Sequence, residues 1–253
     1  MKKAVIIPSY KAEQTLPGVL ERLPESFWHN GIAIIINDGS PDRTGEVAEE
    51  LKKEWPQLLV EHHDPNQGYG AGVKTGFRVA LEQGCEVCAI VHADGQYAPE
   101  KVLDLIAPVE RGEAELVQGS RMVGGGAREG GMPLLRYIPN KLLTALENLA
   151  FGTDYAEFHS GYMIYSAKLI RQIPYQNLQN NYNIDAEMMV CAHILGYRAR
   201  ELPIPTRYDD ETSSLDPIPY GLNVLRMIGR HLAGHYRSLL RAHNHAAQAG
   251  AAT

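Results

Sequence analysis

Cysteine is scarce in this chain of 253 residues, which contains only Cys85, Cys88 and Cys191. An odd number of cysteines in a long chain does not make a disulfide framework. Cys85 and Cys88 have the spacing of a redox motif, but they flank the start of a strand-like run instead of opening a helix after one. We therefore expect all three thiols to pack in the core.

Positive charge is also in short supply. The chain has 24 Lys and Arg against 30 Asp and Glu, which gives a formal net charge of −6. Nucleic acids bind basic surfaces, and the sequence has no stripe of Lys and Arg interleaved with aromatic residues. Nucleic-acid binding is therefore disfavoured.

Long apolar runs are absent as well. A membrane-spanning helix needs roughly 18 or more apolar residues in a row, and no run approaches that length. The apolar stretch at residues 4–7 ends at Pro8 and is too short for the core of a signal peptide. We expect a cytoplasmic chain, with a peripheral contact at the inner face of a membrane left open.

The first half alternates between strand-like and helix-like patterns. Buried-type apolar runs predict strands at 3–7, 32–36, 58–62 and 87–92. The stretches between and after them predict helices at 12–23, 42–54, 71–82 and 99–109. Four such units predict an α/β fold in which a parallel sheet carries helices on both faces.

The pattern changes after a predicted strand at 115–119. Residues 123–131 contain two glycine clusters and predict a mobile loop. Helices are expected near 134–151 and 184–195, short strands near 161–165 and 198–203, and a long terminal helix near 219–243. The alanine-rich tail from His243 is expected to fray.

Metal-capable side chains follow the strand predicted at 87–92. A strand period of two would place His92 and Asp94 on the same face, and Gln96 follows after a glycine. Open α/β sheets bind ligands at the carboxyl ends of their strands, and a hard cation that bridges phosphates needs few carboxylates. The cluster predicts a metal–diphosphate anchor, and a plain polar turn is the alternative.

Asp38 occupies a comparable position directly after the strand at 32–36, followed by Gly39 and Ser40. Its carboxylate can accept hydrogen bonds from a base or a ribose. It can equally shape a turn and cap the next helix. The residues alone leave both interpretations open.

A glycine-rich segment at 68–76 joins a predicted strand to a predicted helix. Val73 stands where a dinucleotide fingerprint needs its third glycine and where a P-loop needs the glycine before Lys74. Both fingerprints therefore fail. Two interpretations remain. The segment can be a glycine-rich helix N-terminus whose main-chain N–H groups and Lys74 face a phosphate, or it can be a turn with a purely structural role.

Taken together, these residues resemble family 2 glycosyltransferases, in which such motifs occur in the same order. The first half supplies Pro8-Ser9-Tyr10 with Glu13, Asn37 to Asp42, Asn66-Gln67-Gly68, Lys74-Thr75-Gly76, His92 to Tyr97 and Gly119-Ser120-Arg121. The second half looks like the polyprenyl-phosphate branch typified by dolichol-phosphate mannose synthase. It supplies Met132-Pro133, Pro139-Asn140-Lys141, Glu157 to Tyr162, Asp185-Ala186-Glu187, Pro205 to Tyr208 and Ser213-Ser214.

The resemblance implies a GT-A fold, inverting transfer, a nucleoside-diphosphate sugar as donor and Mg²⁺ or Mn²⁺ as cofactor. It implies donor contacts from Pro8, Tyr10, Glu13, Asp38, Gly39, Ser40, Lys74, His92 and Ala93, and metal contacts from His92, Asp94 and Gln96. The catalytic residues would be Asp94, Arg121, Asp185 and Glu187. The acceptor would contact Arg121, Arg136, Lys141, Ser160 and Arg207.

The sequence departs from the family pattern at two positions. His92 replaces a metal-motif carboxylate, which predicts either a lower metal affinity or a preference for Mn²⁺, the more nitrogen-tolerant ion. Met163 replaces an arginine that would contact phosphate, and this second departure leaves the acceptor open.

A polyprenyl phosphate is already ionised near neutral pH and needs cations, not a base. A sugar hydroxyl in cell-surface polysaccharide synthesis needs a base, for which the sequence offers Asp185, Glu187 and Glu157. A catalytically silent nucleotide-sugar-binding protein and, more distantly, a nucleotidyltransferase are further alternatives.

We expect a GT-A domain at 1–215, with a nucleotide-sugar half at 1–120 and an acceptor half at 121–215, followed by an amphipathic helix and tail at 216–253. The helix has an apolar stripe of Leu222, Leu225, Ile228, Leu232, Tyr236 and Leu239, and a basic face of Arg226, Arg230, Arg237 and Arg241. Such a helix can lie on an anionic membrane, or pack on the catalytic domain or on a second subunit of a homo-oligomer.

Overall fold

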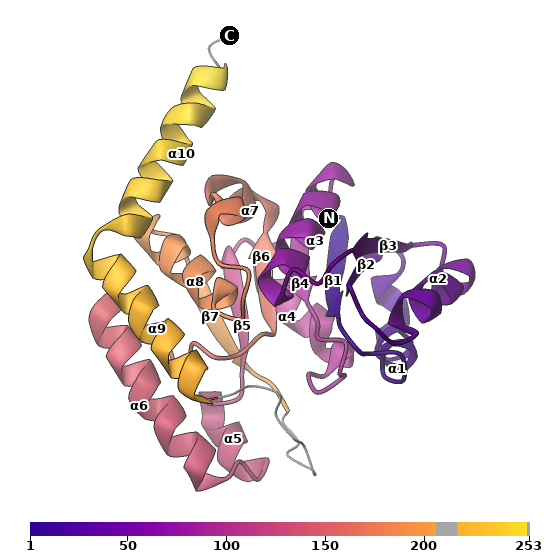
Figure 1. Cartoon of the computed structure of the whole chain (residues 1–253), viewed down its shortest axis with the longest axis horizontal. Coiled ribbons are helices and arrows are strands. Elements are labelled where there is room, and N and C mark those ends of the chain that lie inside the picture. The colour runs from indigo at the N-terminus through magenta and orange to yellow at the C-terminus, as the bar shows by residue number, and fades with distance from the viewer. Residues whose placement is uncertain (206–216, 252–253) are drawn as a thin grey trace.

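Seven strands form one sheet in the computed structural model, which describes residues 1–205 and 217–251 (Figure 1). In spatial order they are β3 (Leu58–His63), β2 (Gly31–Asp38), β1 (Lys3–Ser9), β4 (Val87–Ile90), β6 (Met163–Ser166), β5 (Leu116–Ser120) and β7 (Ala199–Pro203). Neighbouring strands are parallel except at β6, which is antiparallel to both β4 and β5. The predicted α/β fold with a mostly parallel sheet is confirmed.

Helices flank this sheet. They are α1 (Leu16–Glu21), α2 (Thr44–Glu54), α3 (Tyr69–Glu82), α4 (Val102–Glu110), α5 (Gly126–Glu129), α6 (Leu134–Phe151), α7 (Ala167–Gln172), α8 (Ile184–Ile194), α9 (Pro217–Leu232) and α10 (His235–Ala251). Figure 1 shows α6 and α9 side by side at one end of the molecule. Among the described residues, no helix combines the length and the apolar character that a bilayer span requires.

The strands send alternate side chains into two apolar layers. Ile6 of β1 packs in one layer with Phe77 of α3, whereas Val5 packs in the other with Leu20 of α1. This division follows from the strand period of two, which points successive side chains to opposite faces. A sheet buried on both faces explains why its strands read as nearly continuous apolar runs.

The C-terminal helices share the layer that contains Phe77. Val224 and Met227 of α9 and Tyr236 and Leu240 of α10 are all buried in it. Of the predicted apolar stripe, Ile228 and Tyr236 are buried in this layer and so pack against the body of the protein. The exposed part consists of Leu222, Leu225 and Leu232. The division expected between residues 215 and 216 falls outside the described residues and stays a prediction.

Several predicted elements differ from the structure. The terminal helix divides at Gly234, whose φ of +77° is a left-handed conformation that ends helices. Helix α10 then continues to Ala251, where we expected a frayed tail. The first helix begins at Leu16, because a turn occupies residues 13–15. The segment predicted as a loop at 123–131 contains the short helix α5.

Candidate active site

The carboxyl ends of β1, β2 and β4 meet at one edge of the sheet, because these three strands are parallel neighbours. β1 ends at Ser9, β2 ends at Asp38, and the chain leaves β4 toward His92 and Asp94. β6 is antiparallel, so the residues before it, 157–162, approach the same edge. We call this region the carboxyl-edge site.

Hydrogen bonds tie together the loops that follow β1 and β2. The main-chain N–H of Lys11 donates to Ser40 Oγ (3.2 Å), and that of Arg43 donates to Glu13 Oε2 (2.9 Å). Tyr10 is 49% exposed in the first of these loops. Glu13 and Ser40, predicted as nucleoside contacts, thus brace the loops, while Tyr10 leaves part of its ring open to a ligand.

Asp38 is buried, and both of its carboxylate oxygens are used. Oδ1 lies 2.7 Å from His63 Nδ1 and accepts the main-chain N–H of Gln67 (2.9 Å), and Oδ2 accepts that of Gly68 (2.8 Å). Gly39 follows with a φ of +61°, and an added Cβ there would lie 2.4 Å from a facing main-chain nitrogen. Asp38 therefore shapes the loop after β3, and a nucleoside contact stays a prediction.

Residues 176–180 occupy the space in front of α3. The N–H of Gly70 donates to Asn180 O (2.8 Å), and a Cβ added at Gly70 would lie 2.6 Å from Gln179 O. The buried ammonium group of Lys74 donates to two main-chain carbonyls of this segment and to Asn180 Oδ1 (2.7 Å). The structure therefore does not support the phosphate contact predicted for Lys74, because these three acceptors match its three hydrogens. Pro8, another predicted donor contact, lies beside this helix, against Gly72.

β4 ends at Ile90, so His92 and Asp94 lie beyond the strand. The strand period that we used to place them on one face does not apply to residues outside the strand. Asp94 is exposed, and its Oδ1 accepts the main-chain N–H of Gln96 (3.0 Å) across a turn at Gly95, whose φ is +69°. Ala93 is buried in the same turn.

Asp94 suits a hard divalent cation. Such an ion binds through one or two carboxylates and takes its remaining ligands from phosphate and water oxygens. Among the described residues, no group of three or more His, Cys, Asp and Glu side chains gathers around a common point. The donor set therefore fits a metal that arrives with a diphosphate, with Asp94 as its carboxylate and Gln96 exposed nearby.

His92 is partly buried against aromatic side chains. Its ring makes edge contacts with Tyr69 (5.3 Å between centroids) and Tyr97 (4.9 Å), and its Nε2 lies 3.3 Å from the Tyr69 hydroxyl oxygen. A Cβ added at Gly161 would lie 2.3 Å from the same nitrogen. Burial lowers the pKa of His92. Metal coordination through Nε2 does not fit, because this nitrogen faces Tyr69 and Gly161.

The Tyr69 hydroxyl connects His92 to Asp185 on α8. It donates to Asp185 Oδ2 (2.9 Å), and the Tyr165 hydroxyl donates to Oδ1 (3.1 Å). Burial raises the pKa of Asp185 to about 7. A carboxyl group that titrates near neutral pH can hold or release a proton during a reaction. The structure thus brings the predicted catalytic Asp185 to the carboxyl-edge site through Tyr69.

Glu187 has different partners, because residues two apart on a helix are turned by about 200° from one another. Its fully buried carboxylate accepts the main-chain N–H of Gln179 (2.7 Å) and the Tyr236 hydroxyl (2.7 Å), and it pairs with Arg230 (2.9 Å). Glu187 therefore anchors α9 and α10 to α8. The structure does not bring it together with Asp185 at the site.

Arg121, directly after β5, is held by Glu157. Its main-chain N–H donates to Glu157 Oε1 (2.6 Å), and its guanidinium group donates to Glu157 Oε2 (2.9 Å) and to His159 O (2.7 Å). Glu157 is fully buried, whereas the side chain of Arg121 is 18% exposed. Ser160 donates its hydroxyl hydrogen to a main-chain carbonyl of β5. Glu157, weighed above as a base, is thus committed to orienting Arg121.

The remaining predicted acceptor contacts lie on other elements. Arg136 and Lys141 are exposed on α6, the helix that packs beside α9 (Figure 1). Arg207 lies outside the described residues, and its acceptor contact stays a prediction.

Several tyrosines of the site were missed by the sequence reasoning. Tyr182 is 48% exposed and stacks on Tyr69, with 5.1 Å between ring centroids. Tyr97 also contacts the His92 ring, and its hydroxyl oxygen accepts the main-chain N–H of Gly161 (3.0 Å). The chain has 13 Tyr but only 4 Phe, and this imbalance is a signal that could have pointed to a tyrosine-lined site.

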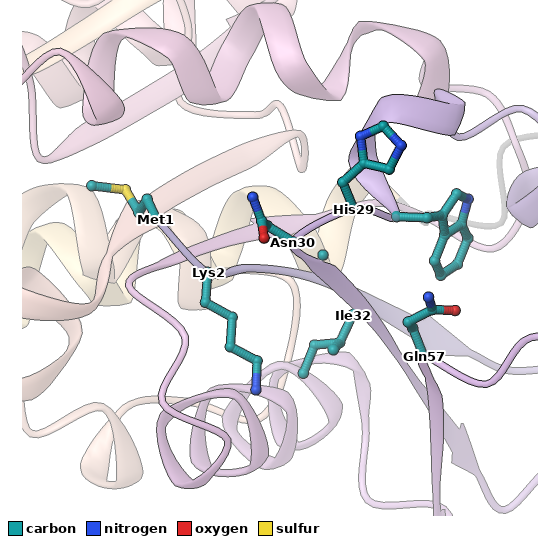
Figure 2. A pocket seen from close by; sticks show the side chains of 8 residues that line it. Met1, Lys2, His29, Asn30, Ile32 and Gln57 are labelled. Atoms are coloured by element: carbon teal, nitrogen blue, oxygen red, sulfur yellow. The ribbon is translucent and has the colours of Figure 1, made fainter.

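A cavity of about 410 Å³ lies at the opposite edge of the sheet (Figure 2). Lys2, Asn30 and Gln57 line it, and these residues precede β1, β2 and β3. Because the amino ends of parallel strands point away from their carboxyl ends, this cavity is not part of the carboxyl-edge site.

Two proteins are similar in sequence to this chain over most of its length. It is 31% identical over 205 residues to the undecaprenyl-phosphate mannosyltransferase of Micrococcus luteus, with 81% of this chain and 83% of the relative covered. It is 30% identical over 202 residues to the polyprenol monophosphomannose synthase of Mycolicibacterium smegmatis, with 79% and 75% covered.

Solved structures agree at the level of the fold. The glucosyl-3-phosphoglycerate synthase of Mycobacterium tuberculosis, crystallised with Mn²⁺, UDP and phosphoglyceric acid, superposes with a TM-score of 0.63 at 17% identity, covering 93% of this chain and 78% of that one. This likeness concerns the fold alone, and it agrees with the GT-A fold expected above. The model of the family described as "Glycosyl transferase family 2" matches residues 4–174. With this match over most of its length, the chain belongs to glycosyl transferase family 2 and is a glycosyltransferase.

Proposed function

We propose that this enzyme transfers a sugar, with inversion, from a nucleoside-diphosphate sugar to a polyprenyl phosphate at an anionic membrane surface. The names of the two relatives, undecaprenyl-phosphate mannosyltransferase and polyprenol monophosphomannose synthase, support this acceptor class. The single observation that carries the proposal is an exposed apolar surface on α6 and α9.

This surface, which we call the leucine face, consists of large apolar side chains that are 41–90% exposed. On α6 they are Leu134, Leu135, Ile138, Leu142, Leu146 and Leu149, and on α9 they are Leu222, Leu225 and Leu232. The two helices pack against each other and lie side by side at one end of the molecule (Figure 1). In this proposal their exposed leucines form one surface. Large exposed apolar patches mark sites where a protein contacts a partner or a membrane.

The charge around the leucine face favours an anionic membrane over a second copy of the chain. Glu147 is the only acidic residue in the sequence ranges of α6, α9 and α10, and it is fully buried. Exposed cations in the same helices are Arg136, Lys141, Arg226, Arg237 and Arg241. Like charges would oppose pairing of two such faces, whereas each cation near an anionic leaflet contributes on the order of 1 kcal/mol to binding.

The chemistry of the carboxyl-edge site suits a phosphate acceptor. A phosphate monoester needs no strong base near neutral pH, since its second pKa is roughly 6. Arg121 supplies a fixed guanidinium group whose two-pronged geometry matches phosphate oxygens. In this proposal Arg121 orients the acceptor oxygen toward the anomeric carbon of the sugar.

The donor would lie across the ends of β1, β2 and β4. Tyr10 and the loop shaped by Asp38 would hold the nucleoside, and Asp94 would hold the divalent cation. When bound, this cation supplies the positive charge that stabilises the leaving diphosphate.

A hydroxyl acceptor is the second candidate, and one observation favours it. The carboxyl group of Asp185, whose pKa is raised to about 7 by burial, could take the proton of an attacking hydroxyl through Tyr69. This candidate would be favoured if the enzyme transferred its sugar to a hydroxyl group of another sugar in a reaction that depends on Asp185, and transferred none to a polyprenyl phosphate.

A two-part transfer assay tests the role of the leucine face. The double variant Leu135→Glu/Leu149→Glu should lose sugar transfer to polyprenyl phosphate embedded in phosphatidylglycerol vesicles, because two charges interrupt the apolar contact. It should keep transfer to farnesyl phosphate in solution. Lys53→Glu on α2, an exposed charge change elsewhere, should keep both activities. Equal activity of the double variant and the native chain on vesicles would refute the membrane contact.

A further inference from the structure

Residues 156–161, which we call the hub loop, join the carboxyl-edge site to the helices that carry the leucine face. On the site side, Glu157 Oε2 and His159 O both accept hydrogen bonds from the guanidinium group of Arg121. The N–H of Gly161 donates to the Tyr97 hydroxyl (3.0 Å). The orientation of Arg121 therefore depends on where the hub loop lies.

On the helix side, the imidazole of His159 is held from two directions. Its Nδ1 lies 2.7 Å from the Tyr220 hydroxyl of α9, and its Nε2 lies 3.1 Å from Glu147 Oε2 of α6. The His159 side chain is only 9% exposed, and the Tyr220 ring makes an edge contact with it at 5.4 Å between centroids. One residue thus contacts α6 and α9 through its side chain and Arg121 through its carbonyl.

Glu147 is an unusual residue to find in this place. It is fully buried, and burial raises its pKa while the nearby His159 lowers it. Within the described part of the chain, neither carboxylate oxygen of Glu147 makes a hydrogen bond of ordinary geometry. The close polar contact of this carboxylate is the one with His159 Nε2. A buried carboxyl group with a single polar partner contributes little to the stability of the fold. In some proteins, buried ionic groups are instead retained because they select one conformation of the residues around them.

We propose that Glu147, His159 and Tyr220 are positioning residues that hold the hub loop, and through it Arg121, in the orientation that receives the acceptor phosphate. The Arg121 part of this inference rests on the proposed function. The sequence did not connect the three residues, because they lie on α6, the hub loop and α9 and come together only in the folded chain.

The first experiment needs no ligand. The rotation rate of the Arg121 guanidinium group is measured by ¹⁵N NMR in the native chain, in Tyr220→Phe and in Glu147→Gln. We expect rotation to become about threefold faster or more in both variants, because charge-assisted hydrogen bonds restrain the group. Tyr197→Phe, which removes a hydroxyl from a ring that packs on Lys168 elsewhere, should leave the rate unchanged. Unchanged rotation in both variants would overturn the proposal. A further pair of variants tests His159 itself. Rotation of the Arg121 guanidinium group should be slower in His159→Asn, which keeps a polar group near Tyr220, than in His159→Ala.

The second experiment measures binding of farnesyl phosphate by calorimetry in a double-mutant cycle. Tyr220→Phe should weaken binding about fivefold in the native background and have no further effect in an Arg121→Ala background, because coupled residues are not additive. An equal loss in both backgrounds would mean that Tyr220 is merely structural and would overturn the positioning role. If the native chain does not bind farnesyl phosphate at all, the proposed acceptor is wrong, and the rotation rates still decide whether the three residues position Arg121.

Discussion

Asp94 and His92 are two residues apart, yet the structure gives them different surroundings. Asp94 is exposed in the turn after β4, whereas His92 is partly buried against Tyr69, Tyr97 and Gly161. A carboxylate open to solvent can join a cation that arrives with a diphosphate, and an imidazole nitrogen directed at a tyrosine hydroxyl cannot do so without moving. The two side chains therefore make a matched pair for testing the metal site.

Asp94→Asn should lower the affinity for UDP or GDP in the presence of Mn²⁺ by about tenfold or more, because it removes the carboxylate from the cation. His92→Asn, which introduces the same residue at the partly buried position, should change the affinity for UDP or GDP by less than about threefold. Calorimetric titrations with and without Mn²⁺ measure both values, and circular dichroism confirms folding. If His92→Asn abolishes Mn²⁺-dependent binding and Asp94→Asn does not, the assignment is reversed.

Asp185 should make the stability of the protein depend on pH. Its pKa rises from 3.8 in the unfolded chain to about 7 in the folded one, so well below pH 3.8 the carboxyl group is protonated in both states and costs no stability. As the pH rises from 4 to 7, the unfolded state ionises first, and the folded state loses up to about 4 kcal/mol of relative stability, at about 1.4 kcal/mol per pKa unit.

Urea unfolding of Asp185→Asn against the native chain, at several values between pH 4 and pH 8, measures this effect. The difference in unfolding free energy should shift in favour of the variant as the pH rises to 7 and then level off. Asp104→Asn, at an exposed carboxylate on α4, should give a nearly flat difference. A flat profile for Asp185→Asn would show that Asp185 is ionised throughout this range in the folded protein.

The sequence was a good guide to single residues where their place depends on the local chain. It predicted that Asp38 and Asp94 lie at the carboxyl ends of buried strands, and in the structure Asp38 is the last residue of β2 and Asp94 lies in the turn after β4. It failed for Lys74, because the acceptors of its ammonium group lie about a hundred residues away in 176–180. Contacts of this kind are set by tertiary packing, which no local pattern records.

At the scale of an element, the amino end of α3 is shaped by what packs against it. The glycines in this helix looked like a phosphate-binding start, but Gly70 is in contact with the main chain of residues 179–180. The absence of a side chain there allows a close approach of two backbones.

Gly70→Ala should therefore destabilise the protein by about 1–3 kcal/mol, since its Cβ would lie 2.6 Å from Gln179 O. Gly229→Ala on α9 is the matched control, because a Cβ there meets nothing within 4 Å. It should be neutral or stabilising by up to about 1 kcal/mol, as alanine restricts the unfolded chain. Urea denaturation of both variants decides, and equal stability would contradict the packing role of Gly70.

Most elements were predictable because their patterns are local. The alternation of apolar runs and amphipathic stretches located the four β–α units, and the helix expected at 134–151 coincides with α6. The antiparallel direction of β6 was not predictable, since four residues carry no signal of direction. The break at Gly234 was passed over because the apolar stripe continues at helical spacing on both sides of it.

On the scale of the whole molecule, charge is unevenly distributed. The chain has a formal net charge of −6, yet α6, α9 and α10 carry cations and no exposed acidic residue in their described parts. A molecule of this kind can be repelled by an anionic membrane over most of its surface and attracted at one end. This attraction would then turn the leucine face toward the lipid.

The choice of acceptor is the central claim, and a transfer assay tests it most directly. The native chain is incubated with Mn²⁺, a panel of radiolabelled nucleoside-diphosphate sugars, and either farnesyl phosphate or farnesol. Our account predicts that label from at least one donor passes to farnesyl phosphate and that none passes to farnesol, because the attacking oxygen must already be ionised. The account would be contradicted if label passed to farnesol at a similar rate. It would also be contradicted if neither farnesyl compound were labelled while the hydroxyl group of a sugar acceptor was glycosylated.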